Sequence, residues 1–188
     1  MLLFEESFAD PTKLPREWVV GPGMAVRDGV LAFSPGDDER YCVGVTRRSD
    51  FRNFSLTADV RIVCAAVGLV LRCVGPSQYY MVQFDLKNNP SVVWFHTFTP
   101  AAAEGYRLEV VPTLVVPRVG AWHRMRVVAS GFAFDVYLGE LGGALQHCAS
   151  WRDSNETYHQ GAVGVWEHGG EVGEYRALRV DGLDEAAT

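Results

Sequence analysis

The stretch VGLVLRCVGPSQYYMVQFDL, residues 67–86, predicts a β-hairpin. It consists of two apolar and aromatic runs of strand composition, separated by the turn signal Gly-Pro-Ser. Because successive side chains of a strand point to opposite faces, this hairpin has one apolar face and one face that carries polar groups. Those groups are Arg72, Gln83 and Asp85. We expect the apolar face to pack in a core and the polar face to meet a ligand.

Short runs of strand composition recur along the rest of the chain. The predicted strands cover residues 3–8, 17–20, 25–27, 30–33, 42–46, 54–63, 92–98, 106–111, 122–128, 132–138, 162–168 and 174–180. Turn signals such as Asp28-Gly29, Pro35-Gly36-Asp37 and Asn88-Asn89-Pro90 separate them. No window shows a helical period longer than a turn or two, so parallel crossovers are not expected. The pattern predicts an all-β antiparallel sandwich or barrel.

Residues 54–62, FSLTADVRI, show the clearest alternation. Every second residue, from Phe54 to Ile62, is apolar, whereas Asp59 and Arg61 fall on the opposite face. A slip of one residue would bury both charges without partners, so the hydrophobic pattern specifies the register of this strand.

Length and composition indicate one domain, residues 1–188, with a frayed tail from about residue 182. Residues 100–117 depart from the regular spacing and predict either an extra hairpin or a long loop that could form a wall over one end of a groove. The net charge of −6, without a basic stripe, argues against nucleic acid. No apolar run approaches the roughly 20 residues of a membrane helix, so no membrane partner is expected.

The N-terminus meets two glutamates before an apolar region of signal-peptide length can form. We therefore expect a cytoplasmic protein, or else a processed or excised secreted domain. The four cysteines are Cys42, Cys64, Cys73 and Cys148. Their spacing contains no CxxC pair, which argues against zinc, and free thiols are expected over a disulfide.

The chain lacks GxSxG, P-loop and HExxH motifs. Glycoside hydrolysis normally requires two carboxylates that flank the bond. Asp59 and Asp85 could form such a pair only if their strands were neighbours. The sequence His168-Gly169-Gly170 is interpreted as a turn, because no nucleophile elbow accompanies it.

Strand alternation places an unusual set of side chains on the face that points away from the core, together with the polar groups of the hairpin. The set consists of Asp59, Arg61, Arg72, Tyr79, Gln83, Asp85, Trp94, His96, Trp166 and His168. Sugars are bound by this mixture of aromatic rings and forked polar groups. The alternatives are an ordinary solvated sheet face, core positions for the two tryptophans, structural roles for the histidines, and a cross-strand ion pair between Arg72 and Asp85.

Four segments carry a family resemblance: ESFAD…LPREWVV…MAVRDGVLAF, FSLTADVRI…VGLVLR…YYMVQFDL, AWHRMRVVASGFAFDVYL and GAVGVWEHGGEVGEYRALRV. From about residue 6 to 180 the chain resembles concanavalin A-like jelly-roll domains, in particular the 3-keto-disaccharide hydrolase family and levanase-type fructan-binding modules. The resemblance implies a jelly-roll β-sandwich of two curved antiparallel sheets with a sugar site on the concave face. The positions that line this site in the family fall here on Arg72, Gln83, Asp85, Trp166 and His168. Trp166 stands where the keto-sugar hydrolases tend to carry Gln, a change that favours stacking over chemistry.

These observations lead to three functional hypotheses. The first is a carbohydrate-binding, lectin-like domain in which Trp94 and Trp166 stack on sugar. In this hypothesis Arg72, Gln83 and Asp85 fix hydroxyls, and His96 and His168 complete the site. The second is a hydrolase of 3-keto-glycosides, with His168 or Asp85 as base and Arg72 stabilising the enolate. The third is a structural interaction module without a small-molecule ligand.

The sequence gives no reason to expect a cofactor. A structural calcium ion, as in many such sandwiches, would bind near Asp10 or Asp181, although no ligand spacing indicates it. The oligomeric state does not follow from the sequence.

Overall fold

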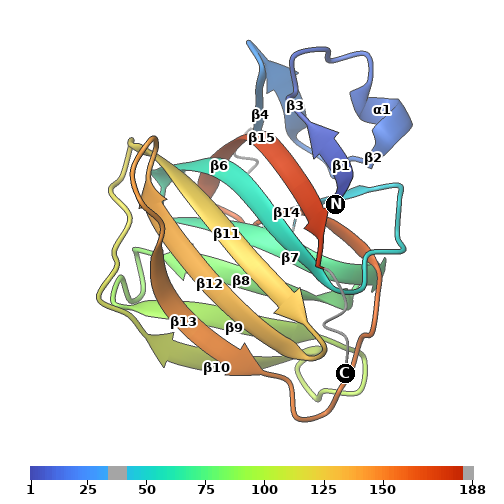
Figure 1. Ribbon diagram of the computed structural model, residues 1–188, viewed down its shortest axis with the longest axis vertical. Coiled ribbons are helices and arrows are strands. Elements are labelled where there is room, and N and C mark those ends of the chain that lie inside the picture. The colour runs from blue at the N-terminus through green and yellow to red at the C-terminus, as the bar shows by residue number, and fades with distance from the viewer. Residues whose placement is uncertain (34–41, 184–188) are drawn as a thin grey trace.

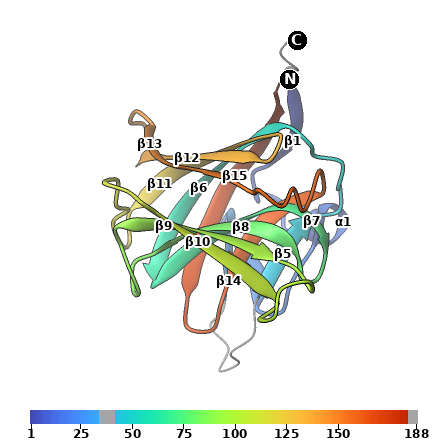
Figure 2. The same cartoon turned by 90° about the horizontal axis from the view of Figure 1, so that it is seen from below.

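A computed structural model describes residues 1–33 and 42–183, and it consists of two antiparallel sheets packed face to face (Figures 1 and 2). The eight-stranded sheet contains β1 (Leu2–Glu6), β3 (Met24–Arg27), β4 (Val30–Phe33), β6 (Phe54–Cys64), β11 (Trp122–Ser130), β12 (Ala133–Glu140), β13 (Gln146–Arg152) and β15 (Val172–Gly182). The seven-stranded sheet contains β2 (Trp18–Val19), β5 (Cys42–Thr46), β7 (Ala66–Gly75), β8 (Gln78–Asp85), β9 (Val92–Phe98), β10 (Tyr106–Pro112) and β14 (Ala162–Glu167).

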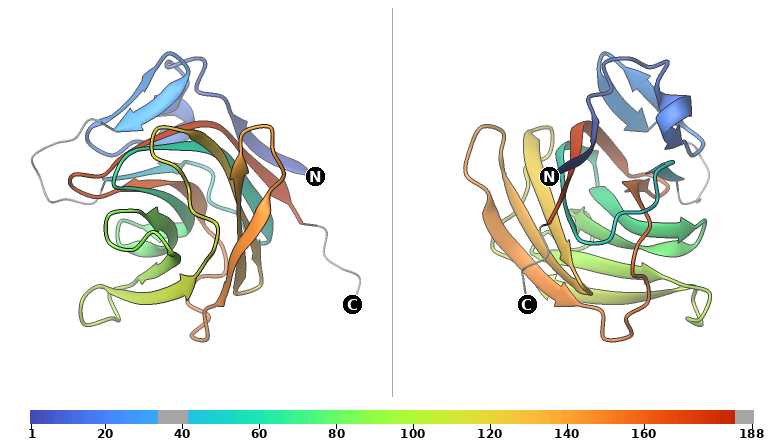
Figure 3. Two further views of the ribbon diagram at one scale, coloured as in Figure 1. Left: turned by 90° about the vertical axis from the view of Figure 1, so that its left-hand side faces the viewer. Right: turned by 45° about the vertical axis from the view of Figure 1, so that its right-hand side comes forward.

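The strand order is β13-β12-β11-β6-β15-β4-β3 in the first sheet, where β1 also pairs with β15, and β10-β9-β8-β7-β14-β5-β2 in the second. Figure 3 shows the N-terminal segment, with the one-turn helix α1 (Leu14–Glu17), at one end of the sandwich. Within the described residues, no helix is long and apolar enough to cross a membrane. The predicted all-β, antiparallel fold class is confirmed.

The predicted strands are present with shifts of a few residues at their ends, and one strand was missed. Strand β13 has the sequence QHCASWR, in which only Cys148 and Ala149 are buried. It is an edge strand that pairs on one side with β12, so little apolar burial marks it in the sequence. The predicted turn Pro35-Gly36-Asp37 lies outside the described residues.

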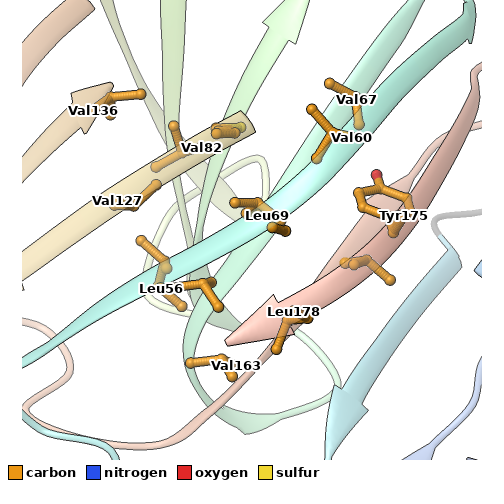
Figure 4. Close-up of a cluster of buried hydrophobic side chains, with 14 of the residues drawn as sticks. Leu56, Val60, Val67, Leu69, Val82, Val127, Val136, Val163, Tyr175 and Leu178 are labelled. Carbon is orange, nitrogen blue, oxygen red and sulfur yellow. The ribbon is translucent and has the colours of Figure 1, made fainter. Parts of the chain in front are cut away.

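The core lies between the inner faces of the two sheets. Figure 4 shows Leu56 and Val60 of β6 in one cluster with Leu69 of β7 and Val82 of β8. These positions match the predicted alternation of both segments. Asp59 is on the outer face of the eight-stranded sheet, as the register argument requires, where it pairs with Arg124 and Arg176.

The seven-stranded sheet is also covered on its outer face, by a second group of apolar side chains. We call this group the outer apolar layer, and it consists of Val70, Cys73, Tyr79, Met81, Phe98, Ala162 and Trp166, with Val43, Val45 and Tyr106 packed against them. Strands β8 and β14 are buried at nearly every position as a result. This two-sided burial explains why apolar residues predominate in both strands, although β8 also carries Gln78, Gln83 and Asp85.

The predicted extra hairpin at residues 100–117 is confirmed, since β10 pairs with β9 at the edge of the seven-stranded sheet. At the other end of the chain, β15 extends into the predicted tail as far as Gly182. The backbone N–H of Leu183 donates to the carbonyl of Asn53, and residues 184–188 lie outside the described part. All four cysteines are free, as expected.

A β-bulge interrupts the alternation of β7 at Arg72. This residue has a φ of 50°, and the pairing of β7 with β8 shifts register between Leu71 and Gly75. Its guanidinium therefore lies 5.5 Å from the ring of Phe134, a residue of the core between the sheets. The expectation that Arg72 projects outward is wrong. It assumed regular alternation of side chains between the two faces of β7, and the extra residue of a bulge breaks that alternation.

Backbone carbonyls satisfy the buried Arg72 side chain. Its Nε and Nη2 donate to the carbonyl of Arg52, at 3.1 and 2.6 Å, and its Nη1 donates to that of Tyr158 at 3.1 Å. The side chain is fully buried, and burial lowers its pKa to about 10. Arg72 thus links the loops that contain Arg52 and Tyr158 to the end of β7.

We predict that Arg72→Met lowers the free energy of unfolding by about 2–4 kcal/mol, because it removes three donors and leaves buried carbonyls without partners. Urea denaturation followed by circular dichroism measures this change. Arg118→Met is the matched control, since Arg118 is exposed and makes only a surface ion pair with Glu140. Equal effects of the two substitutions would contradict a structural role for Arg72.

Candidate functional site

The candidate site is a cavity of about 270 Å³ on the outer face of the seven-stranded sheet. We call it the polar cavity, and its lining consists of Gln83, Asp85, Asn88, Trp94, His96, Phe98, Tyr106, Leu108, Trp166, His168 and Glu171. Of the seven side chains that the sequence analysis assigned to a site, six line this cavity, and Arg72 does not. Its size lies just below the usual range of ligand pockets, about 300–1,000 Å³, which fits a single small unit.

Strand β9 supplies an aromatic wall through alternate residues. The ring of His96 is parallel to that of Phe98, at 5.6 Å and 12° between planes, and its centroid is 6.4 Å from that of Trp94. Tyr106 of the neighbouring β10 lies 5.4 Å from His96. The hairpin of β9 and β10 therefore forms one wall of the cavity, which is the role considered for residues 100–117.

Strand β14 and the turn after it supply the opposite aromatic group. The rings of Trp166 and His168 are parallel, 6.1 Å apart with 11° between planes. The indole N–H of Trp166 donates to the hydroxyl of Tyr79 at 3.2 Å, and only 4% of Trp166 is exposed. Trp166 is thus largely buried in the outer apolar layer and also lines the cavity. It combines the core position and the position on the outward face that the sequence analysis considered as alternatives.

Glu171 is the central polar group of the cavity. Its Oε2 accepts hydrogen bonds from the side-chain amide of Gln83 and from the backbone N–H of His168, each at 3.0 Å. Its Oε1 has no hydrogen-bond donor among the residues that the structure describes. The protein therefore holds one carboxylate oxygen of Glu171, and the other accepts no hydrogen bond from the described residues.

Burial shifts the proton affinity of two cavity groups in opposite directions. It raises the pKa of Glu171 to about 7, and the negative charge of Asp85 adds to this effect. It lowers the pKa of His96 to about 4, against the opposing influence of Asp85. Both shifts favour the neutral form, so burial lowers the charge that Glu171 and His96 carry near pH 7.

Asp85 lines the cavity but is also engaged in a turn. One of its oxygens accepts the backbone N–H groups of Lys87 and Asn88 at 3.0 and 2.9 Å, and the other accepts the side-chain amide of Asn88. This carboxylate shapes the loop after β8. It cannot pair with Arg72 as considered, because Asp85 is opposite Ala66 at the other end of β7.

The carboxylate pair of Asp59 and Asp85 is ruled out by topology. Asp59 belongs to β6 of the eight-stranded sheet, whereas Asp85 belongs to β8 of the seven-stranded sheet. Arg61, which the same parity argument had grouped with the site, pairs with Glu174 on the outer face of the eight-stranded sheet.

Several residues of the lining were not predicted from the sequence. The most important of them is Glu171, the central polar group of the cavity. It lies in the turn after β14, where the backbone N–H of Glu171 donates to the carbonyl of His168. Strand alternation does not predict where a turn residue points. Phe98, in contrast, follows Trp94 and His96 at spacing i, i+2, i+4, a signal that could have identified it.

The two positions suggested for calcium are engaged in other contacts. Asp10 accepts hydrogen bonds from Thr12, and Asp181 forms a two-pronged pair with Arg179 at 2.6 and 2.7 Å. Across residues 1–33 and 42–183, no group of three or more His, Cys, Asp or Glu side chains is arranged to hold a metal ion.

Comparison with known proteins identifies the fold. No protein-family model matches the sequence, and no curated protein sequence matches it. Among solved structures, the carbohydrate-binding module CBM66 from Bacillus subtilis is 14% identical with a TM-score of 0.69, and the match covers 88% of this chain and 95% of that one. The exoplasmic/lumenal domain of VIP36, in a form bound to Ca²⁺ and Man3GlcNAc, is 10% identical with a TM-score of 0.71 and coverage of 100% and 92%.

A β-1,3-1,4-glucanase (lichenase) derived from a mouse hindgut metagenome is 13% identical, with a TM-score of 0.68 and coverage of 96% and 99%. Identities this low establish the fold and not the activity. The chain is therefore a concanavalin A-like jelly-roll β-sandwich.

Proposed function

We propose that this protein is a carbohydrate-binding β-sandwich whose polar cavity binds one sugar unit. The convergence of aromatic rings and buried polar groups from β8, β9, β10, β14 and the turn after β14 carries the proposal. A sugar has apolar C–H faces that pack on rings and hydroxyls that need directional donors and acceptors. The fold likeness to a carbohydrate-binding module and a glycan-bound lectin domain supports the same function.

In this proposal one group of side chains packs on the apolar surface of the sugar, and another group forms hydrogen bonds with its hydroxyls. The wall of Trp94 and His96 contacts the C–H surface, and the free Oε1 of Glu171 accepts a hydroxyl. Gln83 and the backbone N–H of His168 hold Glu171 in place. The lowered charge of Glu171 and His96 near pH 7 suits a neutral sugar, because binding then requires no desolvation of a ligand charge. Binding would occur on the concave face that the resemblance implies.

A glycan array followed by titration calorimetry tests this proposal. We expect at least one glycan to bind, and Trp94→Leu to weaken its affinity by about 30-fold, as for a buried aromatic contact. The matched control is Trp122→Leu, because Trp122 lies on the eight-stranded sheet between the guanidinium groups of Arg61 and Arg176. Absence of any bound glycan, or equal affinity of Trp94→Leu and wild type, would refute carbohydrate binding at this cavity.

The state of Glu171 favours a second candidate function, the cleavage of 3-keto-glycosides. A carboxyl group with a pKa of about 7 can both accept and donate a proton at neutral pH. The ketone at C3 acidifies the C2–H, so a base can remove that proton while the C1–O bond breaks and the departing oxygen takes up a proton to leave as an alcohol. Water then adds across the C1=C2 double bond that forms, which completes the hydrolysis. Glu171 and His168 line the same cavity and are the candidates for these roles. Arg72 has no part here, since it lies away from the cavity.

We expect the raised pKa of Glu171 to appear in the pH dependence of stability. Because its folded pKa exceeds the unfolded value of 4.5, the stability that protonated Glu171 contributes to wild type is lost as the pH rises from about 5 to 7.5. Glu171→Gln lacks this loss, so its stability relative to wild type should increase by about 2 kcal/mol over that interval. His96 is present in both proteins and its opposite effect cancels.

Urea denaturation at several pH values measures the difference, and Glu104→Gln, which changes an exposed glutamate, is the control. A pH-independent difference between Glu171→Gln and wild type would contradict the raised pKa.

Incubation with 3-keto-glucosides separates the two candidate functions. If the protein is a hydrolase, it should release the alcohol, and Glu171→Gln should slow the release by about 10²-fold or more. Release at the wild-type rate by Glu171→Gln would exclude Glu171 as the proton-transferring group. If wild type releases no alcohol while the glycan array shows binding, the hydrolase candidate is rejected and the binding function stands.

A further inference from the structure

A second and larger hollow lies beside the polar cavity. We call it the apolar groove; its volume is about 760 Å³, and its lining consists of Val19, Val20, Gly21, Pro22, Val43, Val45, Cys73, Val74, Gly75, Pro76, Ser77 and Ala162. Residues 19–22, after β2, form one wall, and residues 73–77, at the turn between β7 and β8, form the other. Among the residues that the structure describes, the lining contains no charged side chain, and Ser77 supplies its only hydroxyl.

The groove leaves apolar side chains in water. Val19, Val20 and Val74 are 50, 38 and 53% exposed, and all three line it. Exposed apolar patches that cluster in a hollow are typical of binding sites, because their burial by a ligand is favourable. The volume falls within the range of small-molecule pockets.

The floor of the groove is continuous with the wall of the polar cavity. Trp166, which lines the cavity, is directly opposite Val43, which lines the groove, in the pairing of β14 with β5. Both side chains belong to the outer apolar layer. From Trp166 to Ala162 the floor follows β14 for four residues, roughly 13 Å at the usual strand rise. The side chains of Val43, Val45 and Ala162 make this floor apolar.

We propose that the apolar groove binds the apolar aglycone of a glycoside whose sugar occupies the polar cavity. This inference rests on the proposed carbohydrate function and adds the class of ligand. A second sugar does not suit the groove, since its side chains offer one hydroxyl where sugar hydroxyls need several partners. A charged group does not suit it either, because no side chain of the lining could neutralise the charge. An alkyl or aryl group matches both the uncharged lining and its continuity with the cavity.

The test compares glycosides that differ only in the aglycone. Methyl and n-hexyl β-D-glycosides of glucose, galactose and mannose are titrated by calorimetry, with n-hexanol as the ligand that lacks a sugar. For at least one sugar we expect the hexyl glycoside to bind about 30-fold or more tightly than the methyl glycoside, because the added methylenes leave water. We expect n-hexanol to bind more weakly than that hexyl glycoside.

Val74→Asp is the variant that tests the location. Val74 lines the groove but not the polar cavity, and its exposure allows the substitution without loss of folding. The variant should abolish most of the hexyl advantage and keep the affinity for the methyl glycoside within about twofold, since an aspartate beside an alkyl chain must be desolvated. Val119→Asp introduces the same charge at an exposed valine outside both sites and should bind like wild type.

Each contrary result has its own meaning. Equal binding of methyl and hexyl glycosides overturns the inference and leaves the sugar site intact. Binding of n-hexanol as tightly as of the hexyl glycoside overturns it too, because the sugar would then contribute nothing. A dimer that Val74→Asp dissociates, without any chain-length effect, would assign the groove to a second copy. If no glycoside binds, the inference fails, and the glycan array decides whether the proposed function fails with it.

Discussion

The burial of the seven-stranded sheet on both faces is the constraint on which the rest of the structure depends. Its inner face packs in the core between the sheets, and its outer face carries the outer apolar layer. A sheet covered on one side only would place polar side chains over β8 and β14, with no enclosed space between them. Here aromatic side chains on the outer face line the polar cavity, and smaller apolar side chains line the apolar groove. Fold and site therefore depend on the same residues.

Strand alternation predicted much of this arrangement. It assigned the correct faces to Leu69, Val82 and Gln83, and it grouped six of the side chains that line one cavity. It failed where the backbone departs from the regular strand. The bulge turns Arg72 into the core, and the turn after β14 brings Glu171 back over the sheet. Neither departure has a local sequence signal, because each depends on which strands become neighbours.

The polar groups of the cavity also illustrate what burial does to charge. Gln83, Glu171 and His96 stand among aromatic rings, where a full charge is poorly solvated. The protein limits this cost through the shifted pKa values of Glu171 and His96 and through donors that satisfy one oxygen of Glu171. For the proposed sugar ligand, which carries no charge, shape and hydrogen-bond direction are the features that such a site can recognise.

Binding and cleavage place different demands on Glu171. For binding, the carboxyl group must stay in place, and the two hydrogen bonds to its Oε2 serve this purpose. For cleavage, the same group must exchange a proton with the ligand, which an Oε1 without a donor among the described residues and the pKa of about 7 would allow. Cleavage also needs a group that stabilises the enolate oxygen. The arginine assigned to that role is held by the carbonyls of Arg52 and Tyr158, and the other carboxylate, Asp85, is engaged in its own turn. The geometry thus meets the demands of binding more fully than those of catalysis.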